Sequence, residues 1–215
     1  MSSAREEIFQ RIRRAKGSST PESAASAYDG IDRSYQSVAT LSREAIIDLF
    51  EERLREYDAN VYRMAPSQAG EAIEDILIGR QVQRVLVPEG LPSEWMRGAE
   101  FVVDRDFSSA QLDDYKAVMT TATLGIAETG TIVLQTVPGQ GRRAITLVPD
   151  YHLCVLSTDK VVETVVEAMR MLEATKDLPT TFFSGPSATA DIEMTRIKGV
   201  HGPRFVDVVL LSETT

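Results

Sequence analysis

The feature that most constrains the fold of this chain is the alternation of short apolar runs with segments of helical periodicity. In the helical segments, apolar residues recur every three or four positions, as on one face of an amphipathic helix. Such an alternation favours a parallel or mixed β-sheet flanked by helices, because both kinds of element then bury their apolar faces. In the first half of the chain we predict helices at residues 42–57 and 68–80, and strands at residues 61–64 and in RVLVPEG and AEFVVDR.

The second half of the chain changes character. Three strand-rich stretches, KAVMTTATLGIAETGTIVLQT, RRAITLVP and YHLCVLST, are separated by Gly/Pro turns, of which PGQGRR is the sharpest. Strands so close in sequence usually pair antiparallel as hairpins. A helix at residues 160–174, a strand in PTTFFSG, a helix or helical turn in SATADIEMTRIKG and a last strand in RFVDVVLLS follow. The prediction is one α/β domain over residues 41–215, with a mixed, mostly parallel sheet flanked by helices.

An N-terminal arm is predicted to precede this domain. Residues 3–16 show the pattern of a short charged helix, and residues 17–34 are rich in Ser, Ala and Gly, which is typical of a tether. That composition buries too little apolar surface to offset the entropy lost on ordering. We therefore assign residues 1–40 to a helical arm and flexible tether, and expect residues 1–34 to be mobile or docked only through contacts in a homo-oligomer.

Charge and cysteine content exclude several classes of function. The net charge of -9 argues against nucleic-acid binding, which needs a basic face, although a local nest of N–H groups can still hold an anion. No apolar run is long enough to span a bilayer, and the N-terminus lacks the apolar centre of a signal peptide. The single cysteine, Cys154, allows no internal disulfide, which indicates the cytoplasm. One cysteine also cannot hold an iron–sulfur cluster or a thiolate zinc site, so we expect no cofactor on this chain.

An anion site is predicted in SGPSATADIE, which follows an apolar strand and opens the helix expected there. Gly185, Ser187 and Thr189 stand at the junction, and Asp191 falls in the first turn. A Gly-rich turn that opens a helix directs free N–H groups and the positive end of the helix dipole at one point. The same residues could instead form a well-capped helix without a ligand. Neither a Walker A loop nor GxGxxG is present.

Glu128 is the most unexpected residue of the second half, because it is a carboxylate between two stretches that read as buried strands. Burying an ionised carboxylate costs several kcal/mol unless it is paired or hydrogen-bonded. A Glu-Thr-Gly turn could present the carboxylate to a cleft. Thr129 would then orient the carboxylate or its ligand, and Gly130 would allow close backbone approach. The alternative is a carboxylate that braces the turn through backbone N–H groups. The sequence leaves both interpretations open.

His201 lies in KGVHGPRF, between glycines and a proline and just before a strand. A histidine held in such a loop can face a cleft, and its pKa suits proton transfer or anion binding. It could equally bond only to local backbone. The other histidine, His152, precedes a strand and is interpreted as structural or as part of a substrate rim. Two histidines without HExxH do not support a catalytic zinc site, and the absence of GxSxG makes a hydrolase triad a poor fit.

Three blocks in this order, GIAETGTIVL, LVPDYHLCVL and GPSATADIEMTRIKGVHGP, resemble the LUD-domain family, in its lactate-utilisation protein C group. The resemblance covers about residues 117–211. It implies a fold similar to the sugar-phosphate isomerase and CoA-transferase-like superfamily. It also implies that Glu128 and His201 act at one cleft in which the SGPSATADIE turn binds a small carboxylate or phosphorylated anion.

The resemblance implies a role in the oxidation of L-lactate to pyruvate, within a multiprotein system. This chain would be a non-redox component that binds a small organic anion or docks iron–sulfur partner proteins, which carry the clusters. A second possibility is a free-standing isomerase or an acyl- or CoA-transferase with Glu128 as nucleophile or base, since AETG loosely resembles the glutamate element of that superfamily. A third is a scaffold whose cleft has lost its role.

Overall fold

The computed structural model describes residues 4–17, 21–189, 197–199 and 201–212. The chain divides into two compact units, residues 1–35 and residues 36–215. The first unit contains α1 (Ala4–Lys16) and α2 (Pro21–Asp29). The helix predicted at residues 3–16 is therefore confirmed, whereas the predicted tether contains a second helix.

The first unit makes no core of its own, because no residue of α1 is buried and Ile8, Phe9 and Ile12 are all exposed. Deletion of residues 1–34 is therefore expected to change the melting temperature by no more than about 2 °C. Thermal unfolding of the full and shortened chains, followed by circular dichroism, measures this. A fall of more than about 5 °C would instead show that the arm packs on the core or at a permanent interface.

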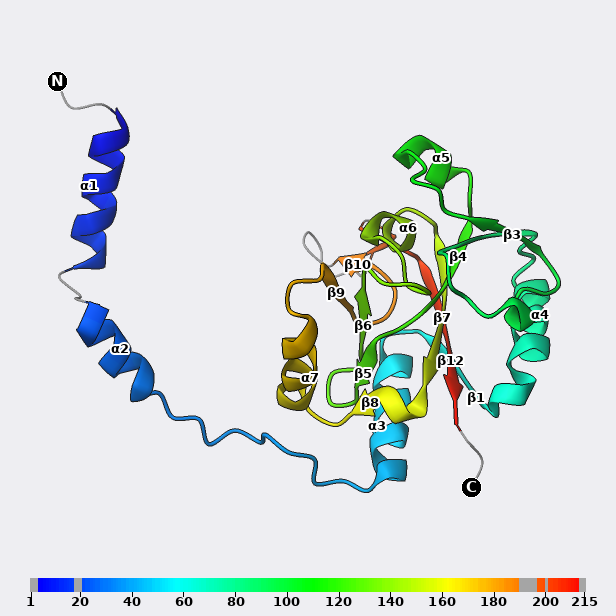
Figure 1. Ribbon diagram of the computed structural model, residues 1–215, viewed down its shortest axis with the longest axis horizontal. Helices are drawn as coiled ribbons and strands as arrows, with labels where there is room; N and C mark the ends of the chain where they lie inside the picture. The colour runs from blue at the N-terminus through cyan, green and yellow to red at the C-terminus, as the bar shows by residue number, and fades with distance from the viewer. Residues whose placement is uncertain (1–3, 18–20, 190–196, 200, 213–215) are drawn as a thin grey trace. The chain divides into compact units, whose positions relative to one another are not determined.

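Two β-sheets form the second unit (Figure 1). The larger sheet is parallel throughout, with the strand order β1-β12-β7-β4-β2-β3. The smaller sheet has the order β8-β5-β6-β9, and β6 is antiparallel to both of its neighbours. The strands of the larger sheet are β1 (Asn60–Met64), β2 (Arg84–Val87), β3 (Glu100–Val103), β4 (Ala117–Thr121), β7 (Tyr151–Ser157) and β12 (Phe205–Leu211). Those of the smaller sheet are β5 (Leu124–Ile126), β6 (Thr131–Gln135), β8 (Val161–Val162) and β9 (Thr180–Phe183).

Helices cover both faces of the larger sheet, which explains why its central strands are apolar at nearly every position. On one face α4 (Ala69–Gly79) packs on β7 and β12 through Ile73 and Leu77. On the other face lie α3 (Arg43–Glu56), through Phe50 and Leu54, and the smaller sheet. The far side of the smaller sheet is covered by α7 (Val165–Leu172). The layers are therefore α4, the larger sheet, then α3 and the smaller sheet, and finally α7 (Figure 1). The predicted α/β class with a mostly parallel sheet is confirmed.

The remaining elements are short. Two further α-helices are α5 (Ser109–Asp113) and α6 (Arg143–Leu147). Single turns of 3₁₀-helix occur at Pro66–Gln68, Ser93–Trp95, Thr158–Lys160 and Glu173–Thr175. A two-stranded antiparallel ladder joins β10 (Ala188–Thr189) to β11 (Ile197–Lys198).

Three local predictions are wrong. RRAITLVP forms α6 rather than a strand, because Ala144, Ile145 and Val148 share one helical face and pack on β2 and β4. PGQGRR leads into this helix, and the hairpin lies instead at the Glu-Thr-Gly turn between β5 and β6. The helix expected at residues 160–174 begins only at Val165, because Val161–Val162 pairs with β5 as an additional strand.

Candidate functional site

Three of the predicted site residues, Gly185, Ser187 and His201, line one cavity of about 310 Å³. The cavity lies beside β9 and α6, near the start of β7 and β12. Its walls also include Arg143, Thr146, Leu147, His152, Thr181, Phe182, Phe183, Ser184 and Val206. The structure thus brings the GPS turn and the histidine loop together, although they are separated in the sequence.

Ser187 holds the two loops to each other. Its backbone N–H donates to the Pro203 carbonyl (2.8 Å), and its carbonyl accepts from the Gly199 N–H (2.9 Å). Its Oγ accepts a hydrogen bond from the backbone N–H of His201 (3.0 Å). The serine N–H is therefore already occupied and cannot serve as a free donor to an anion.

The helix expected after the GPS turn falls mostly on residues 190–196, which lie outside the described residues. The chain continues from Ser187 into β10, where Thr189 pairs with Ile197 of β11. These paired positions hold β-branched residues, which favour a strand. The described positions Ala188 and Thr189 are thus in a strand, and an anion site at this turn stays a prediction. Asp191 lies outside the described residues.

Gly185 is required by the fold, and its contact with a ligand stays a prediction. Its φ is +70°, a conformation that other residues rarely adopt. A Cβ at this position would lie 2.3 Å from the Tyr57 Cβ, which is far too close. Glycine therefore lets the GPS turn pass against the end of α3.

His152 forms part of the cavity wall, in agreement with the rim interpretation. Its side chain is 1 % exposed, its Nε2 lies 2.8 Å from the Thr120 Oγ1, and its ring packs on Phe183 with centroids 5.2 Å apart. Burial lowers the pKa of His152 to about 4. The imidazole is therefore neutral at pH 7, and it offers a hydrogen bond rather than a charge to a ligand.

Arg143 is the cation of this site, and the sequence analysis did not single it out. It lies on α6, its side chain is exposed, and it makes no ion pair with any residue that the structure describes. The preceding Arg142, by contrast, is bound to the carboxylate of Asp104 through Nε (2.7 Å) and Nη2 (2.9 Å). Arg143 also borders a neighbouring cavity of about 210 Å³ that shares Thr146 and Thr181 with the first. An unpaired guanidinium beside hydroxyl groups suits a carboxylate or a phosphate.

Glu128 lies elsewhere. Its exposed carboxylate accepts a hydrogen bond from the Val165 backbone N–H (2.7 Å), in the first turn of α7. It is not among the residues that line the cavity with His201. A carboxylate is stabilised at a helix start by the free N–H groups and the dipole. The geometry is that of a brace on α7, and catalysis by Glu128 stays a prediction.

The neighbours of Glu128 connect its turn to the cavity wall. The Thr129 Oγ1 lies 2.7 Å from the Thr131 Oγ1, which lies 2.8 Å from the Oγ of Ser184. Gly130 has a φ of +58°, and a Cβ there would lie 2.8 Å from the Cβ of Arg53. Thr129 thus begins a chain of hydroxyls that ends at the cavity, whereas Gly130 serves close packing on α3.

The usual ligand position of such a sheet is filled by the protein itself. In open parallel sheets, ligands bind beyond the carboxyl ends of the strands where the strand order reverses, which here is between β2 and β4. The turn at residues 137–141 packs there: the Gly139 N–H donates to the Glu89 carbonyl, and its carbonyl accepts from the Thr121 N–H (both 2.7 Å). Because this turn occupies that position, the cavity beside Arg143 is the better candidate for a ligand site.

Comparisons with known proteins agree on one family. The model of the LUD domain matches residues 47–211. Lactate utilization protein C of Deinococcus radiodurans is 38 % identical over 212 residues, which are 97 % of this chain and 95 % of that protein. Lactate utilization protein C of Shouchella clausii is 36 % identical over 104 residues, 46 % of this chain and 44 % of that protein. A crystal structure of a DUF162 family protein from Deinococcus radiodurans has a TM-score of 0.68 and 34 % identity, and the match covers 80 % of this chain and 99 % of that one.

Proposed function

Because the chain belongs to the LUD domain family, we propose that it acts in lactate utilisation as a non-redox component that binds a small organic anion in the cavity beside Arg143. The chain matches lactate utilization protein C of Deinococcus radiodurans over nearly its full length, and the name of that protein supports a role in lactate utilisation. The unpaired Arg143 supports the anion, and is the observation that carries the proposal.

The chemistry of the cavity fits a small hydroxy or keto acid. Arg143 pairs with the carboxylate, and the hydroxyls of Thr181 and Ser187 supply neutral hydrogen bonds to the remaining oxygens. The neutral His152 adds a polar group without a second charge. The leucine and phenylalanine side chains of the wall contact the short carbon chain. Such a combination of apolar walls with a few convergent polar groups is typical of small-molecule sites.

Loss of the Arg143 charge is expected to weaken binding of L-lactate or pyruvate at least about tenfold, since a hydrogen bond to a charged group is worth roughly 1.5–3 kcal/mol. Isothermal titration of the full chain and of Arg143→Ala measures this. Arg105→Ala is the matched control, because Arg105 is a surface arginine whose ion pair with Glu89 lies outside the cavity lining. Equal affinities of the three proteins, or no binding by any of them, would contradict the anion site.

We further propose that the oxidation itself takes place on iron–sulfur partner proteins. A chain with one cysteine cannot supply the thiolates that hold such a cluster, and that cysteine, Cys154, is buried. Co-purification from a host that expresses the neighbouring genes tests the association. Recovery of this chain without any iron-containing protein, under conditions that preserve lactate oxidation, would argue against it.

A second candidate is an acyl-transfer or isomerase enzyme that uses Glu128, and the accessible position of this carboxylate favours it. Glu128→Gln keeps the shape of the side chain and removes its charge. If Glu128 is the nucleophile or base, this variant fails to restore growth on L-lactate although it binds the anion normally. If the anion site alone matters, Glu128→Gln restores growth and Arg143→Ala does not.

A further inference from the structure

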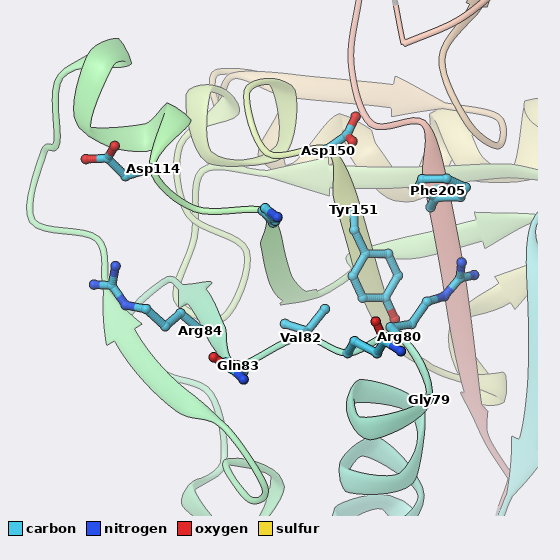
Figure 2. A pocket seen from close by; sticks show the side chains of 11 residues that line it. Gly79, Arg80, Val82, Gln83, Arg84, Asp114, Asp150, Tyr151 and Phe205 are labelled. Atoms are coloured by element: carbon cyan, nitrogen blue, oxygen red, sulfur yellow. The ribbon is translucent and has the colours of Figure 1, made fainter.

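A second cavity, of about 650 Å³, lies on the opposite face of the larger sheet (Figure 2). Neighbouring residues of one strand point to opposite faces. Accordingly, Tyr151 and Phe205 line this cavity, whereas His152 and Val206 line the one beside Arg143. Its other lining residues are Gly79, Arg80, Gln81, Val82, Gln83, Arg84, Asp114, Lys116 and Asp150.

One wall of this second cavity is built around a buried carboxylate. Asp207 is 0 % exposed and accepts hydrogen bonds from the Tyr151 hydroxyl (3.0 Å), the Asn60 amide (2.8 Å) and both Nε (3.0 Å) and Nη2 of Arg80. A buried ion pair contributes little net stability, because removing both charges from water is costly. Its clear effect here is to fix the position of the Arg80 guanidinium.

The fixed guanidinium supports an aromatic surface. Arg80 lies 5.1 Å from the ring centroid of Tyr151 and 5.3 Å from that of Phe205. Phe205 nevertheless remains 47 % exposed. In Figure 2, Tyr151 and Phe205 stand on one side of the cavity, and Val82 and Gln83 lie on the other. A flat ring can therefore stack on Phe205.

Polar groups without partners face the same space. Among the residues that the structure describes, the Lys116 ammonium and the side-chain amides of Gln81 and Gln83 make no hydrogen bond or ion pair. A side-chain amide can donate and accept at the edge of a heteroaromatic ring, and an ammonium pairs with an anionic group.

The other charges of the cavity are already paired or lie at its edge. The Asp150 carboxylate is bound by Arg204 (Nε to Oδ1, 2.6 Å), and Arg84 is bound by the Glu100 carboxylate (3.1 Å). Asp114 lies across the cavity from Tyr151 and Phe205 in Figure 2. Among the described residues, Lys116 is the lining cation for which no ion pair forms.

We propose that this second cavity binds a planar heteroaromatic ring that carries an anionic group, as a nucleoside monophosphate does. The ring stacks on Phe205, the amides of Gln81 and Gln83 contact its edge, and Lys116 pairs with the anion. This site is separate from the anion cavity beside Arg143, and occupation of one does not require the other.

The test uses three probes that divide the ligand into its parts. Adenosine 5′-monophosphate carries the ring and the anion, adenosine carries the ring alone, and ribose 5-phosphate carries the anion alone. Isothermal titration of the full chain is expected to show the monophosphate binding at least about tenfold more tightly than either part. Ribose 5-phosphate binding as tightly as the monophosphate, or no detectable binding of the monophosphate, would overturn the proposal.

Two variants assign the contacts. Lys116→Ala is expected to weaken the monophosphate about tenfold and to leave adenosine unchanged, because only the anionic group has lost its partner. Phe205→Leu keeps an apolar side chain and removes the stacking surface, so both ring-containing probes should weaken by about the same factor. Lys160→Ala, at a surface lysine paired with Asp159, and Arg143→Ala, in the other cavity, are the controls. Unchanged affinity in both Lys116→Ala and Phe205→Leu would place the nucleotide elsewhere and refute the site.

Discussion

Asp207→Ala is expected to lower the free energy of unfolding by about 3–5 kcal/mol, because it leaves the mostly buried Arg80 charge, whose side chain is 27 % exposed, without its partner. It also removes the acceptor of the Tyr151 hydroxyl and the Asn60 amide. For a chain of this size the loss corresponds to a fall in melting temperature of roughly 10 °C. Urea unfolding at pH 7 measures the change.

The double variant Arg80→Met, Asp207→Leu provides the matched control. It replaces both charges by apolar side chains of similar size, so the part of the loss that comes from the unpaired Arg80 charge should return, whereas the Tyr151 hydroxyl and the Asn60 amide still lack their acceptor. A single variant that loses less than about 1 kcal/mol would show that the Arg80 guanidinium reaches water when its partner is removed.

The second large effect is expected at Glu163, which anchors the segment before α3 to the start of α7. Its carboxylate is 6 % exposed and accepts hydrogen bonds from the Thr40 N–H (2.7 Å), the Leu41 N–H (2.9 Å) and the Gln36 amide (2.6 Å). Glu163→Ala is expected to cost about 2–4 kcal/mol, because it leaves these donors without an acceptor. Chemical unfolding measures the loss.

Two deletions separate this contact from other roles of Glu163. Residues 1–34 include none of its donors, so Glu163→Ala should cost the same in a chain that lacks them. A chain without residues 1–41 has lost the donors, so the same substitution should then cost much less. Equal costs in the two shortened chains would show that Glu163 stabilises the fold through a different contact.

The contribution of Glu163 should also depend on pH. The backbone N–H of Leu41, together with the other donors, holds the pKa of Glu163 below its usual value. The folded state therefore binds this proton less readily than the unfolded state, and the stabilisation is complete above the ordinary glutamate pKa of about 4.3. It is lost as the pH falls from there through the folded-state pKa. The difference in stability between wild type and Glu163→Gln should accordingly stay constant from pH 7 to about pH 5 and shrink as the pH falls below about 4.3.

Periodicity in the sequence was sufficient to predict the fold class and most of the helices and strands. The apolar runs YHLCVLST and RFVDVVLLS are strands β7 and β12, since nearly every position of a parallel strand covered on both faces is buried. The helical spacing of residues 42–57 and 68–80 correctly predicted α3 and α4. Such patterns are local, because the apolar residues of one helix or strand recur with the period of that element wherever it contacts the core.

The tertiary structure decided the secondary structure of those segments whose local sequence patterns conflict. RRAITLVP has the composition of a strand, but it forms α6 because Ala144, Ile145 and Val148 pack as one helical face on β2 and β4. The GPS turn leads into β10, and Ser187 is hydrogen-bonded to Gly199, His201 and Pro203 of the loop that follows β11. Neither contact can be seen in a window of neighbouring residues.

The sequence by itself determined which side chains are chemically conspicuous, and the tertiary structure decided which of them meet. Ser187 and His201 could be named from their Gly/Pro surroundings, and they do lie in one cavity. Arg143 could not be identified, because only the fold shows that Asp104 binds the adjacent Arg142, while Arg143 makes no ion pair with any described residue. Glu128 was conspicuous as a charge between strands, yet its direction is set by α7, whose start offers it a free N–H. Proximity between distant segments is a property of packing, and packing is what the linear pattern omits.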